Sequence, residues 1–198
     1  MNEKFFDLKK EKQDRMINAA LKVFALNGYQ HASTDDIVAE AGISKGLLFH
    51  YFHNKLGLYS FLFDYSVRFM LLELSACGGE EKDYFELWKQ MEGAKLMVLK
   101  NYPYMQEFLD SARYEVVKEA LYATEPKREA LSSLREDILG GADLSRFRPE
   151  VDVERMNAIL SHTIRGILSE SFRDGSFHPG VMQEEIEAYL DMMKSISY

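Results

Sequence analysis

Apolar residues recur at three- and four-residue spacing through nearly all of this 198-residue chain, and this spacing constrains its fold more than any other feature. No segment keeps the strict alternation of apolar and polar residues that is typical of a half-buried strand. Glycine and proline are scarce, with 12 and 4 residues, so helices are rarely interrupted. We therefore expect an all-α protein with enough chain to bury a sizeable core.

The stretch Gly42–Lys55, GISKGLLFHYFHNK, has the pattern of the turn and second helix of a helix-turn-helix. Gly42 can adopt the left-handed conformation that ends a helix, and Ser44 can cap the next one. Leu48 and Phe52 are four residues apart, so they share the face that anchors this second helix.

The opposite face of this helix is suited to a DNA groove. Helix N-termini and basic or hydroxyl side chains hold phosphates, and the first residues of a recognition helix reach base edges. Leu47 can contact a thymine methyl group, although an exposed leucine is also ordinary surface. The residues that we expect to point outward are Lys45, Gly46, Leu47, His50, Tyr51 and His53.

Two further helices should precede this one, and a long helix should follow it. The first spans about residues 10–27, with Met16 or Ile17, Ala20, Leu21, Val23, Phe24 and Leu26 on its apolar stripe, and Gly28 stops it. Thr34 can cap the second helix, or bind a DNA phosphate. Asn54 can cap a helix over about residues 55–76, which is apolar nearly all round and should therefore be buried by its neighbours.

The rest of the chain predicts a helical bundle. A helix over about 82–101 should end before Pro103, and the next helical pattern should break at Pro126. Asp152 can cap a helix that runs to about residue 173, and a last helix follows Pro179. We expect these two final helices to form much of a homodimer interface, although closure of the intramolecular core explains their apolar stripes about equally well.

The overall charge of −8 is unusual for a DNA-binding protein, because neutralisation of phosphates supplies much of the affinity for DNA. Residues 1–55 carry eight basic and seven acidic groups, a net charge of +1 that leaves −9 for the rest. A near-neutral head on an acidic body is compatible with weak non-specific binding and reliance on specific contacts. A single cysteine, Cys77, excludes an internal disulfide, and the N-terminus lacks the apolar stretch of a signal peptide, so we expect a cytoplasmic protein.

Residues 19–59, AALKVFALNGYQHASTDDIVAEAGISKGLLFHYFHNKLGLY, resemble the TetR family of bacterial transcriptional regulators across three helices and into the fourth. The resemblance implies an all-α homodimer whose N-terminal helix-turn-helix heads, residues 1–54, enter successive major grooves of a partly palindromic double-stranded DNA operator. It also implies that a long helix joins each head to a C-terminal ligand-binding and dimerisation bundle, residues 55–198.

The family's phosphate and base contacts carry over to matching positions of this chain. Phe49 departs from the tyrosine that is common in the family, which removes one possible phosphate contact. The positions implied to bind DNA are Thr34, Ser44, Lys45, Gly46, Leu47, His50, Tyr51 and Lys55.

The resemblance further implies a small-molecule effector bound in the C-terminal bundle, where it moves the joining helix and releases the operator. Abundant methionine and aromatic residues suit a small, largely apolar effector, although such residues are also ordinary core. The candidate pocket residues are Tyr65, Trp88, Met91, Met97, Tyr104, Met105, Phe108, Tyr114 and Met156.

Two other classes of function compete with a regulator. An enzyme would need a convergent acid, base or nucleophile set, and no phosphate-binding glycine loop, nucleophile elbow or zinc-protease motif is present. His50 and His53 could share a metal, but a DNA-facing or solvent-facing pair explains them better, so we expect no cofactor. A helical interaction module would dimerise without binding DNA. Within the regulator class, repression requires only occupancy of the operator, whereas the sequence leaves activation open.

Overall fold

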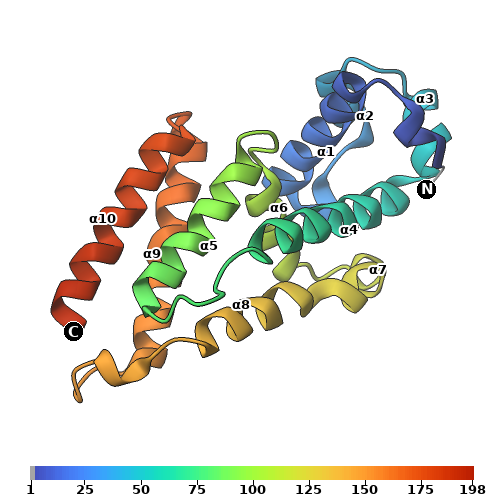
Figure 1. The fold of residues 1–198 in the computed structure, drawn as a ribbon. Coiled ribbons are helices and arrows are strands. Elements are labelled where there is room, and N and C mark those ends of the chain that lie inside the picture. Colours follow the sequence, from blue (N-terminus) through green and yellow to red (C-terminus); the bar gives the residue numbers. More distant parts are fainter. Residues whose placement is uncertain (1–2) are drawn as a thin grey trace. The chain divides into compact units, whose positions relative to one another are not determined.

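The computed structural model describes residues 3–198, and every regular element in that range is a helix, which confirms the predicted all-α class (Figure 1). Within the same range, none of the helices has the length and apolar character that crossing a lipid bilayer requires. The elements are the 3₁₀ helices η1 (Glu3–Asp7) and η2 (Leu144–Arg146) and the α-helices α1 (Lys10–His31), α2 (Thr34–Ala41), α3 (Lys45–Phe52), α4 (Lys55–Leu74), α5 (Tyr84–Leu99), α6 (Met105–Arg113), α7 (Lys118–Arg128), α8 (Ala130–Gly140), α9 (Val153–Asp174) and α10 (Pro179–Ser197).

The chain divides into two compact units, which are described separately. Unit 1 comprises the described residues up to Leu72 together with Val98–Ser133, and it holds α1, α2, α3, α6, α7 and most of α4. Unit 2 comprises Glu73–Met97 and Leu134–Tyr198, and it holds α9, α10 and most of α5 and α8. The functional division after residue 54 stays a prediction.

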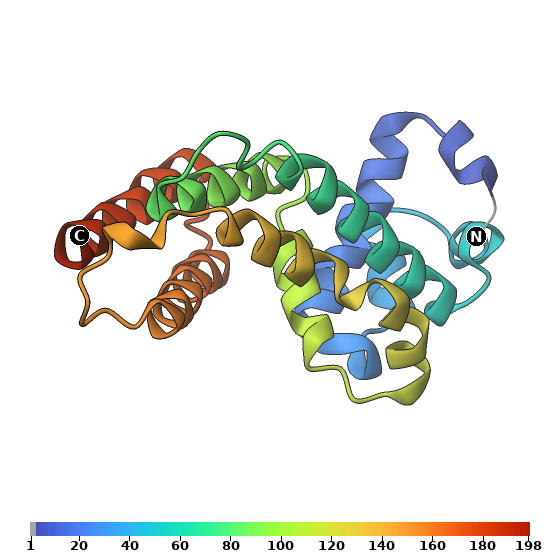
Figure 2. The same cartoon turned by 60° about the horizontal axis from the view of Figure 1, so that its bottom comes forward.

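The core of unit 1 forms around α1, which packs against α2 and lies alongside α6 (Figure 1 and Figure 2). The ring of Tyr59 lies 5.1 Å from that of Phe24 and 5.4 Å from that of Phe108, between centroids. Leu26 is 61% exposed, so its assignment to the apolar stripe was wrong. It follows Phe24 by two residues and therefore lies on the opposite face of the helix. The other stripe residues, Met16, Ile17, Ala20, Leu21, Val23 and Phe24, are buried as predicted.

Asn54 caps α4 as predicted, because its side-chain oxygen accepts a hydrogen bond from the Gly57 N–H at 2.7 Å. The corner before α4 is tight. A Cβ atom at Gly57 would lie 2.2 Å from the Phe52 carbonyl oxygen, so the corner requires glycine. Most of the apolar residues of α4 are buried as expected, but Leu72 is 68% exposed.

Gly28 was predicted to end α1, but it only interrupts this helix. The residue has φ +66° and ψ 176°, which is not helical, and the helix resumes and continues to His31. Such a φ favours glycine, because a Cβ atom is strained there. The kink turns the Tyr29 N–H toward the carboxylate of Glu115, which accepts it at 3.0 Å.

The break predicted at Pro126 lies slightly later, because α7 continues through this residue to Arg128 and α8 begins at Ala130. Proline at this late position removes one backbone donor near the end of the helix. A further break, which was not predicted, lies between Arg113 and Lys118, where the Glu115 carboxylate accepts hydrogen bonds from the N–H groups of Val116 and Val117 at 2.9 and 2.8 Å.

In unit 2, Asp83 directly precedes α5, and its carboxylate accepts hydrogen bonds from the N–H groups of Phe85 and Glu86. The same carboxylate pairs with Arg146 at 2.5 Å and with Lys194 at 3.0 Å. Burial alone would raise the pKa of Asp83, but the hydrogen bond from Lys194 and the charges of Lys194 and Arg146 outweigh burial and hold this pKa below its usual value. One carboxylate therefore joins the start of α5 to η2 and α10.

Asp152 caps α9 as predicted, because its carboxylate accepts a hydrogen bond from the Arg155 N–H at 3.1 Å. This helix packs against α10. Met156, Leu160, Ile164 and Leu168 are buried. Ile159 of the same helix is 52% exposed. On the outer surface of α10, Val181, Tyr189, Met192 and Ile196 are also exposed.

Candidate nucleic-acid interface

The predicted helix-turn-helix geometry is present in α2 and α3. Gly42 has φ +63° and ψ +43°, the left-handed conformation that ends α2. The Ser44 hydroxyl then caps α3 by accepting a hydrogen bond from the Leu47 N–H at 3.2 Å. Leu48 and Phe52 are fully buried, so they anchor α3 as predicted.

Ser33, rather than Thr34, caps α2. The Ser33 hydroxyl accepts a hydrogen bond from the Asp35 N–H at 3.1 Å, and Thr34 is the first helical residue. The prediction that Thr34 caps this helix was therefore wrong by one residue. Thr34 is half-buried, and its hydroxyl does not cap the helix.

The exposed surface of α3 carries Lys45, Gly46 and His50, while Leu47 is half-buried. The Lys45 ammonium donates to both carboxylate oxygens of Asp35, at 2.8 and 3.0 Å. An exposed ion pair of this kind contributes only about 0–1 kcal/mol. A DNA phosphate can therefore replace Asp35 at little energetic cost.

Tyr51 was expected to point outward, and the structure contradicts this, because the residue is only 8% exposed. Its ring packs edge-on against Phe5, with 5.6 Å between centroids, and lies 6.4 Å from Phe52. No hydrogen bond is formed by the Tyr51 hydroxyl within the described residues, and its contact with DNA stays a prediction.

Phe5 was not identified from the sequence as a core residue. This residue of η1 is fully buried, and its ring lies 5.0 Å from Phe52 and 5.4 Å from Phe61, between centroids. The aromatic pair Phe5 and Phe6 before the first predicted helix was the available signal.

Lys55 is the first residue of α4, and its ammonium is directed at the C-terminal end of α1. It donates to the carbonyl oxygens of Gln30 at 3.2 Å and Ala32 at 2.9 Å, and it lies 4.7 Å from the centre of the Tyr29 ring. A cation is stabilised at this end of a helix by the helix dipole. Lys55 therefore has a structural partner besides the phosphate that we predicted for it.

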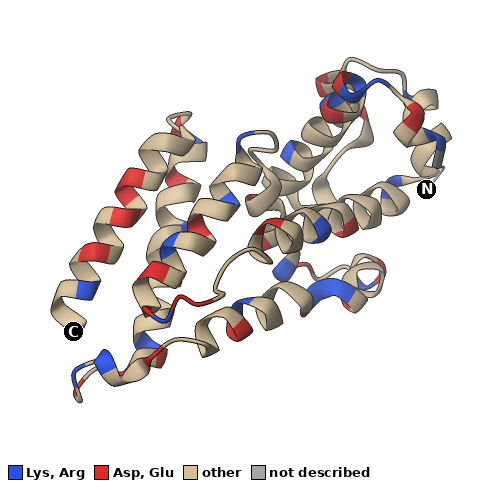
Figure 3. Ribbon diagram, in the orientation of Figure 1, with Lys and Arg blue, Asp and Glu red and all other residues tan. Residues whose placement is uncertain are grey.

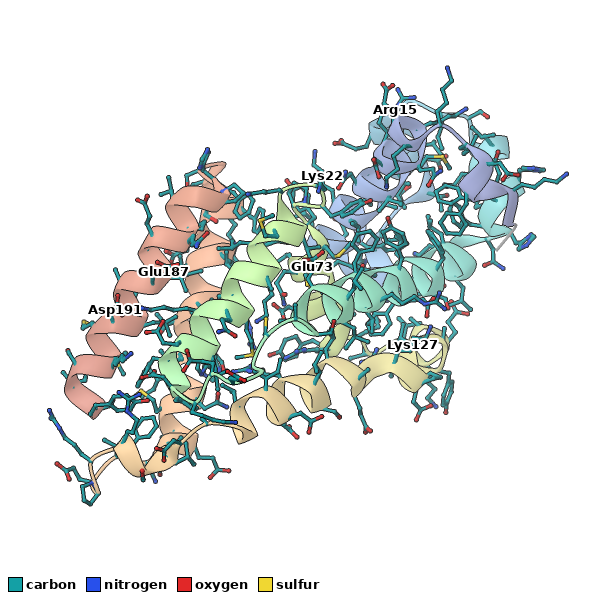
Figure 4. The ribbon with its side chains drawn as sticks, in the orientation of Figure 1. Arg15, Lys22, Glu73, Lys127, Glu187 and Asp191 are labelled. Carbon is teal, nitrogen blue, oxygen red and sulfur yellow. The ribbon has the colours of Figure 1, made fainter. Side chains whose placement is uncertain are left out.

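Basic and acidic side chains both occur in the region of the helix-turn-helix (Figure 3). Arg15 and Lys22 project from α1 (Figure 4), and Lys22 pairs with Glu40 of α2 at 2.7 Å. Both basic residues line a cavity of about 570 Å³ in unit 1, between α1 and the segment that leads into α6. The mixed charge of this region agrees with the near-neutral head expected from the sequence.

His50 and His53, which were considered as a metal-binding pair, do not both lie within α3. His53 has φ +65°, outside the helical range, and it ends α3, whereas His50 lies within the helix with its ring 4.9 Å from that of Tyr51. Within residues 3–198, no group of three or more metal-ligating side chains is close enough to hold an ion.

The residues predicted to line an effector pocket are divided between the two units. Five are buried, namely Trp88, Met91, Met105, Phe108 and Met156, and Tyr65 and Tyr104 are half-buried. Met97 and Tyr114 are 54% and 73% exposed, which does not fit the lining of an enclosed pocket. Met97 is in the last turn of α5, and Tyr114 is the first residue after α6.

Tyr65 takes part in a polar network within unit 1. Its hydroxyl lies 2.7 Å from that of Tyr102, which donates to Asp14 at 2.8 Å and accepts from Lys10 at 2.8 Å. Burial raises the pKa of Tyr102 to about 12, so the hydroxyl keeps its proton at neutral pH. The network joins α1 to α4 and to the segment before α6.

A polar cluster missed by the sequence analysis surrounds Trp88 in unit 2. The Arg135 guanidinium lies 4.4 Å from the centre of the Trp88 ring and donates to Asn157 at 3.0 Å and to Ser161 at 2.7 Å. The Tyr84 hydroxyl also donates to Asn157, at 3.3 Å. These residues come from α5, α8 and α9, so only the tertiary structure brings them together.

The N-terminal region of the chain is similar in sequence to known transcriptional regulators. Residues 16–60 match the family model of bacterial regulatory proteins of the tetR family. A relative from Pseudomonas putida, the uncharacterised helix-turn-helix-type transcriptional regulator TtgW, is 40% identical over 47 residues, which cover 24% of this chain. The match spans 35% of the length of that relative.

Solved structures extend the similarity to the whole fold. A TetR family transcriptional regulator from Chloroflexus aurantiacus is 20% identical, with a TM-score of 0.59 over 99% of this chain and 97% of that one. The ketosteroid transcriptional regulator KstR2 of Mycobacterium tuberculosis is 19% identical, with a TM-score of 0.67 over 96% of each chain. The fatty acid degradation regulator FadR from Bacillus halodurans is 21% identical, with a TM-score of 0.60 over 89% of this chain and 96% of that one. At these identities the comparison establishes a shared fold.

Proposed function

Because residues 16–60 make this chain a member of the TetR family of bacterial regulatory proteins, we propose that it is a sequence-specific DNA-binding transcriptional repressor. A small-molecule effector bound in the C-terminal bundle releases it from its operator. The observation that carries this proposal is the pair of capped helices α2 and α3, joined at Gly42 and presenting Lys45, Gly46 and His50 to solvent. Repression is the simpler mode of action, because it requires only that the protein occupy its operator.

The proposed DNA-contact residues divide by chemistry. Ser44, Lys45, Thr34 and Lys55 supply hydroxyl and ammonium donors for phosphates, which fix the register on the duplex. Gly46 lets the backbone approach the DNA closely, and the half-buried side chain of Leu47 offers an apolar group to a thymine methyl. His50 reaches base edges or phosphates, and Tyr51 contributes its hydroxyl only, because its ring is buried.

The proposed protein acts as a homodimer. Ile159 of α9 and Val181, Met192 and Ile196 of α10 are large apolar side chains that are more than half exposed. A second copy of the chain would bury them, and two-fold symmetry would present two α3 helices to half-sites about 34–36 Å apart on a partly palindromic operator. The protein would act in the cytoplasm, where bacterial DNA is located.

The proposed effector is small and largely apolar, which suits the buried methionine and aromatic residues of the bundle. The polar cluster around Trp88, with Arg135, Asn157 and Ser161, offers the few donors and acceptors that orient a bound molecule. No catalytic role is proposed for any residue.

The experiment that tests this function is a binding titration of the purified protein against DNA from upstream of its own gene and against a scrambled fragment, at two stated salt concentrations. We expect preference for the native fragment at both. If a selection of bound fragments from the whole genome also yields no preferred sequence, the proposal is wrong. Stable dimers without such preference would instead identify a helical interaction module.

A further inference from the structure

The segment before α1 is held firmly against the recognition helix α3. Phe5 of η1 is fully buried, and its ring lies within 5.6 Å of the ring centres of Tyr51 and Phe52 of α3 and of Phe61 of α4. The edge-on and tilted arrangements of these rings are those that aromatic pairs favour. Phe5 is therefore an anchor that fixes the start of the chain beside α3.

A second attachment fixes the other end of this segment. The side-chain amide of Gln13, a buried residue of α1, donates to the carbonyl oxygens of Phe6 at 3.1 Å and Leu8 at 2.7 Å. Buried amides of this kind keep a turn in one conformation, because breaking either bond leaves a polar group unsatisfied. The segment is thus attached to α3 by an apolar ring and to α1 by two hydrogen bonds.

Between and beside these attachments the segment exposes basic side chains. Lys4 directly precedes the anchor and is exposed, as are Asp7 and Lys9 after it, whereas Lys10 is paired with Asp14 at 2.6 Å. The ring of Tyr51, on which Phe5 packs, lies 4.9 Å from the ring of His50, which is exposed on the surface of α3. The anchor therefore lies at the margin of the surface that we propose for DNA binding.

From this arrangement we infer that η1 is a second DNA-contacting element, in which Lys4 binds a backbone phosphate next to the groove that α3 enters. This inference rests on the proposed function. Phosphate contacts orient a protein on the duplex without reading sequence, and a lysine supplies a compact positive charge for them. Because Phe5 and Gln13 already order the backbone, the contact costs less conformational entropy than one made by a flexible tail.

The test is the salt dependence of DNA binding by the full chain and its Lys4→Ala variant, measured on the preferred fragment and on scrambled DNA. For Lys4→Ala, the logarithm of the binding constant should fall less steeply with the logarithm of salt concentration than for the unaltered protein. The slope should be smaller by about 1 per protomer. Affinity for both DNAs should fall by a similar factor. Lys4→Arg should retain most of the slope, and Lys82→Ala, which removes an exposed lysine of unit 2, should leave it unchanged.

Each other outcome has a definite meaning. A slope for Lys4→Ala equal to that of the unaltered protein overturns the inference while leaving the proposed function intact. An equal decrease for Lys82→Ala also overturns it, since net charge alone would then explain the change. Failure of the unaltered protein to bind any DNA overturns the proposed function as well. Phe5→Ala should lower the slope as Lys4→Ala does, because the anchor is lost.

Discussion

The backbone N–H of Tyr29 donates a hydrogen bond to the carboxylate of Glu115 at 3.0 Å, across 86 residues of sequence. The other carboxylate oxygen accepts from the N–H groups of Val116 and Val117 at the start of α7. The Tyr29 hydroxyl in turn donates to Glu119 at 2.5 Å. The kink in α1 and the start of α7 are therefore fixed to each other through two acidic side chains, Glu115 and Glu119.

Replacing Glu115 with alanine should lower the free energy of unfolding by about 1–3 kcal/mol, because three backbone donors lose their acceptor. Urea denaturation at a fixed protein concentration measures the change, and the control is Glu125→Ala, which removes an exposed carboxylate from α7, the helix that follows Glu115. Equal stability of the two variants would show that water replaces the carboxylate without cost.

Gly57→Ala should destabilise the protein by about 1–3 kcal/mol, because the new methyl group would lie 2.2 Å from the Phe52 carbonyl oxygen. Relief of this clash requires the end of α3 to move, so DNA affinity should fall as well. Gly93→Ala is the control, since its methyl group meets no atom within 4 Å and should stabilise α5 by up to about 1 kcal/mol. Thermal melts that place both variants above the parent protein would contradict the clash.

The two parts of the Tyr51 side chain should have separable roles. Tyr51→Ala removes a buried ring and should cost about 3 kcal/mol of stability, whereas Tyr51→Phe should leave stability nearly unchanged. If the hydroxyl binds a phosphate, Tyr51→Phe should still weaken binding to all DNA sequences. Parallel denaturation and DNA titrations measure the two effects, and unaltered affinity of Tyr51→Phe would remove this residue from the interface.

Lys55→Met keeps an apolar stem but loses the ammonium that donates to Gln30 and Ala32. We expect stability to fall by about 1–2 kcal/mol, since hydrogen bonds to a charged group are lost. The salt slope of DNA binding should also decrease by about 1 per protomer. A stability loss without any change of slope would restrict Lys55 to holding the end of α1.

The ion pairs of Asp83 should make unit 2 sensitive to acid. A carboxyl group whose pKa is lowered in the folded state stabilises the fold above its unfolded pKa of about 3.9, and this stabilisation is lost as pH falls through the lower folded value. The stability advantage of the unaltered protein over Asp83→Asn should therefore be present at pH 6 and shrink below about pH 4. Urea denaturation of both proteins at pH 6 and pH 3 measures it, and a constant difference would contradict the prediction.

Local signals in the sequence predicted the helix ends well. Gly42, Ser44, Asn54 and Asp152 have the predicted conformation or capping hydrogen bond, because these depend on a few neighbouring residues. The cap of α2 fell on Ser33 instead of Thr34, since adjacent hydroxyl residues offer nearly equivalent caps.

Features that depend on distant parts of the chain were not predictable in the same way. Tyr51 follows the buried Leu48 by three residues, so it lies beside the buried face of α3, and the distant segment that contains Phe5 packs against its ring. The polar groups around Trp88 come from three helices, so no sequence window contains them together. The DNA contacts and the effector pocket stay predictions, because they concern molecules outside this chain.

The packing of α1 against α6 also bears on how the protein is made. Residues 10–31 leave the ribosome well before residues 105–113, so the apolar face of α1 must wait for its partner during synthesis. Contacts so far apart in sequence form slowly, because closing the intervening loop costs entropy before any contact compensates for it. Unit 1 therefore completes its fold only after more than half of the chain has been translated.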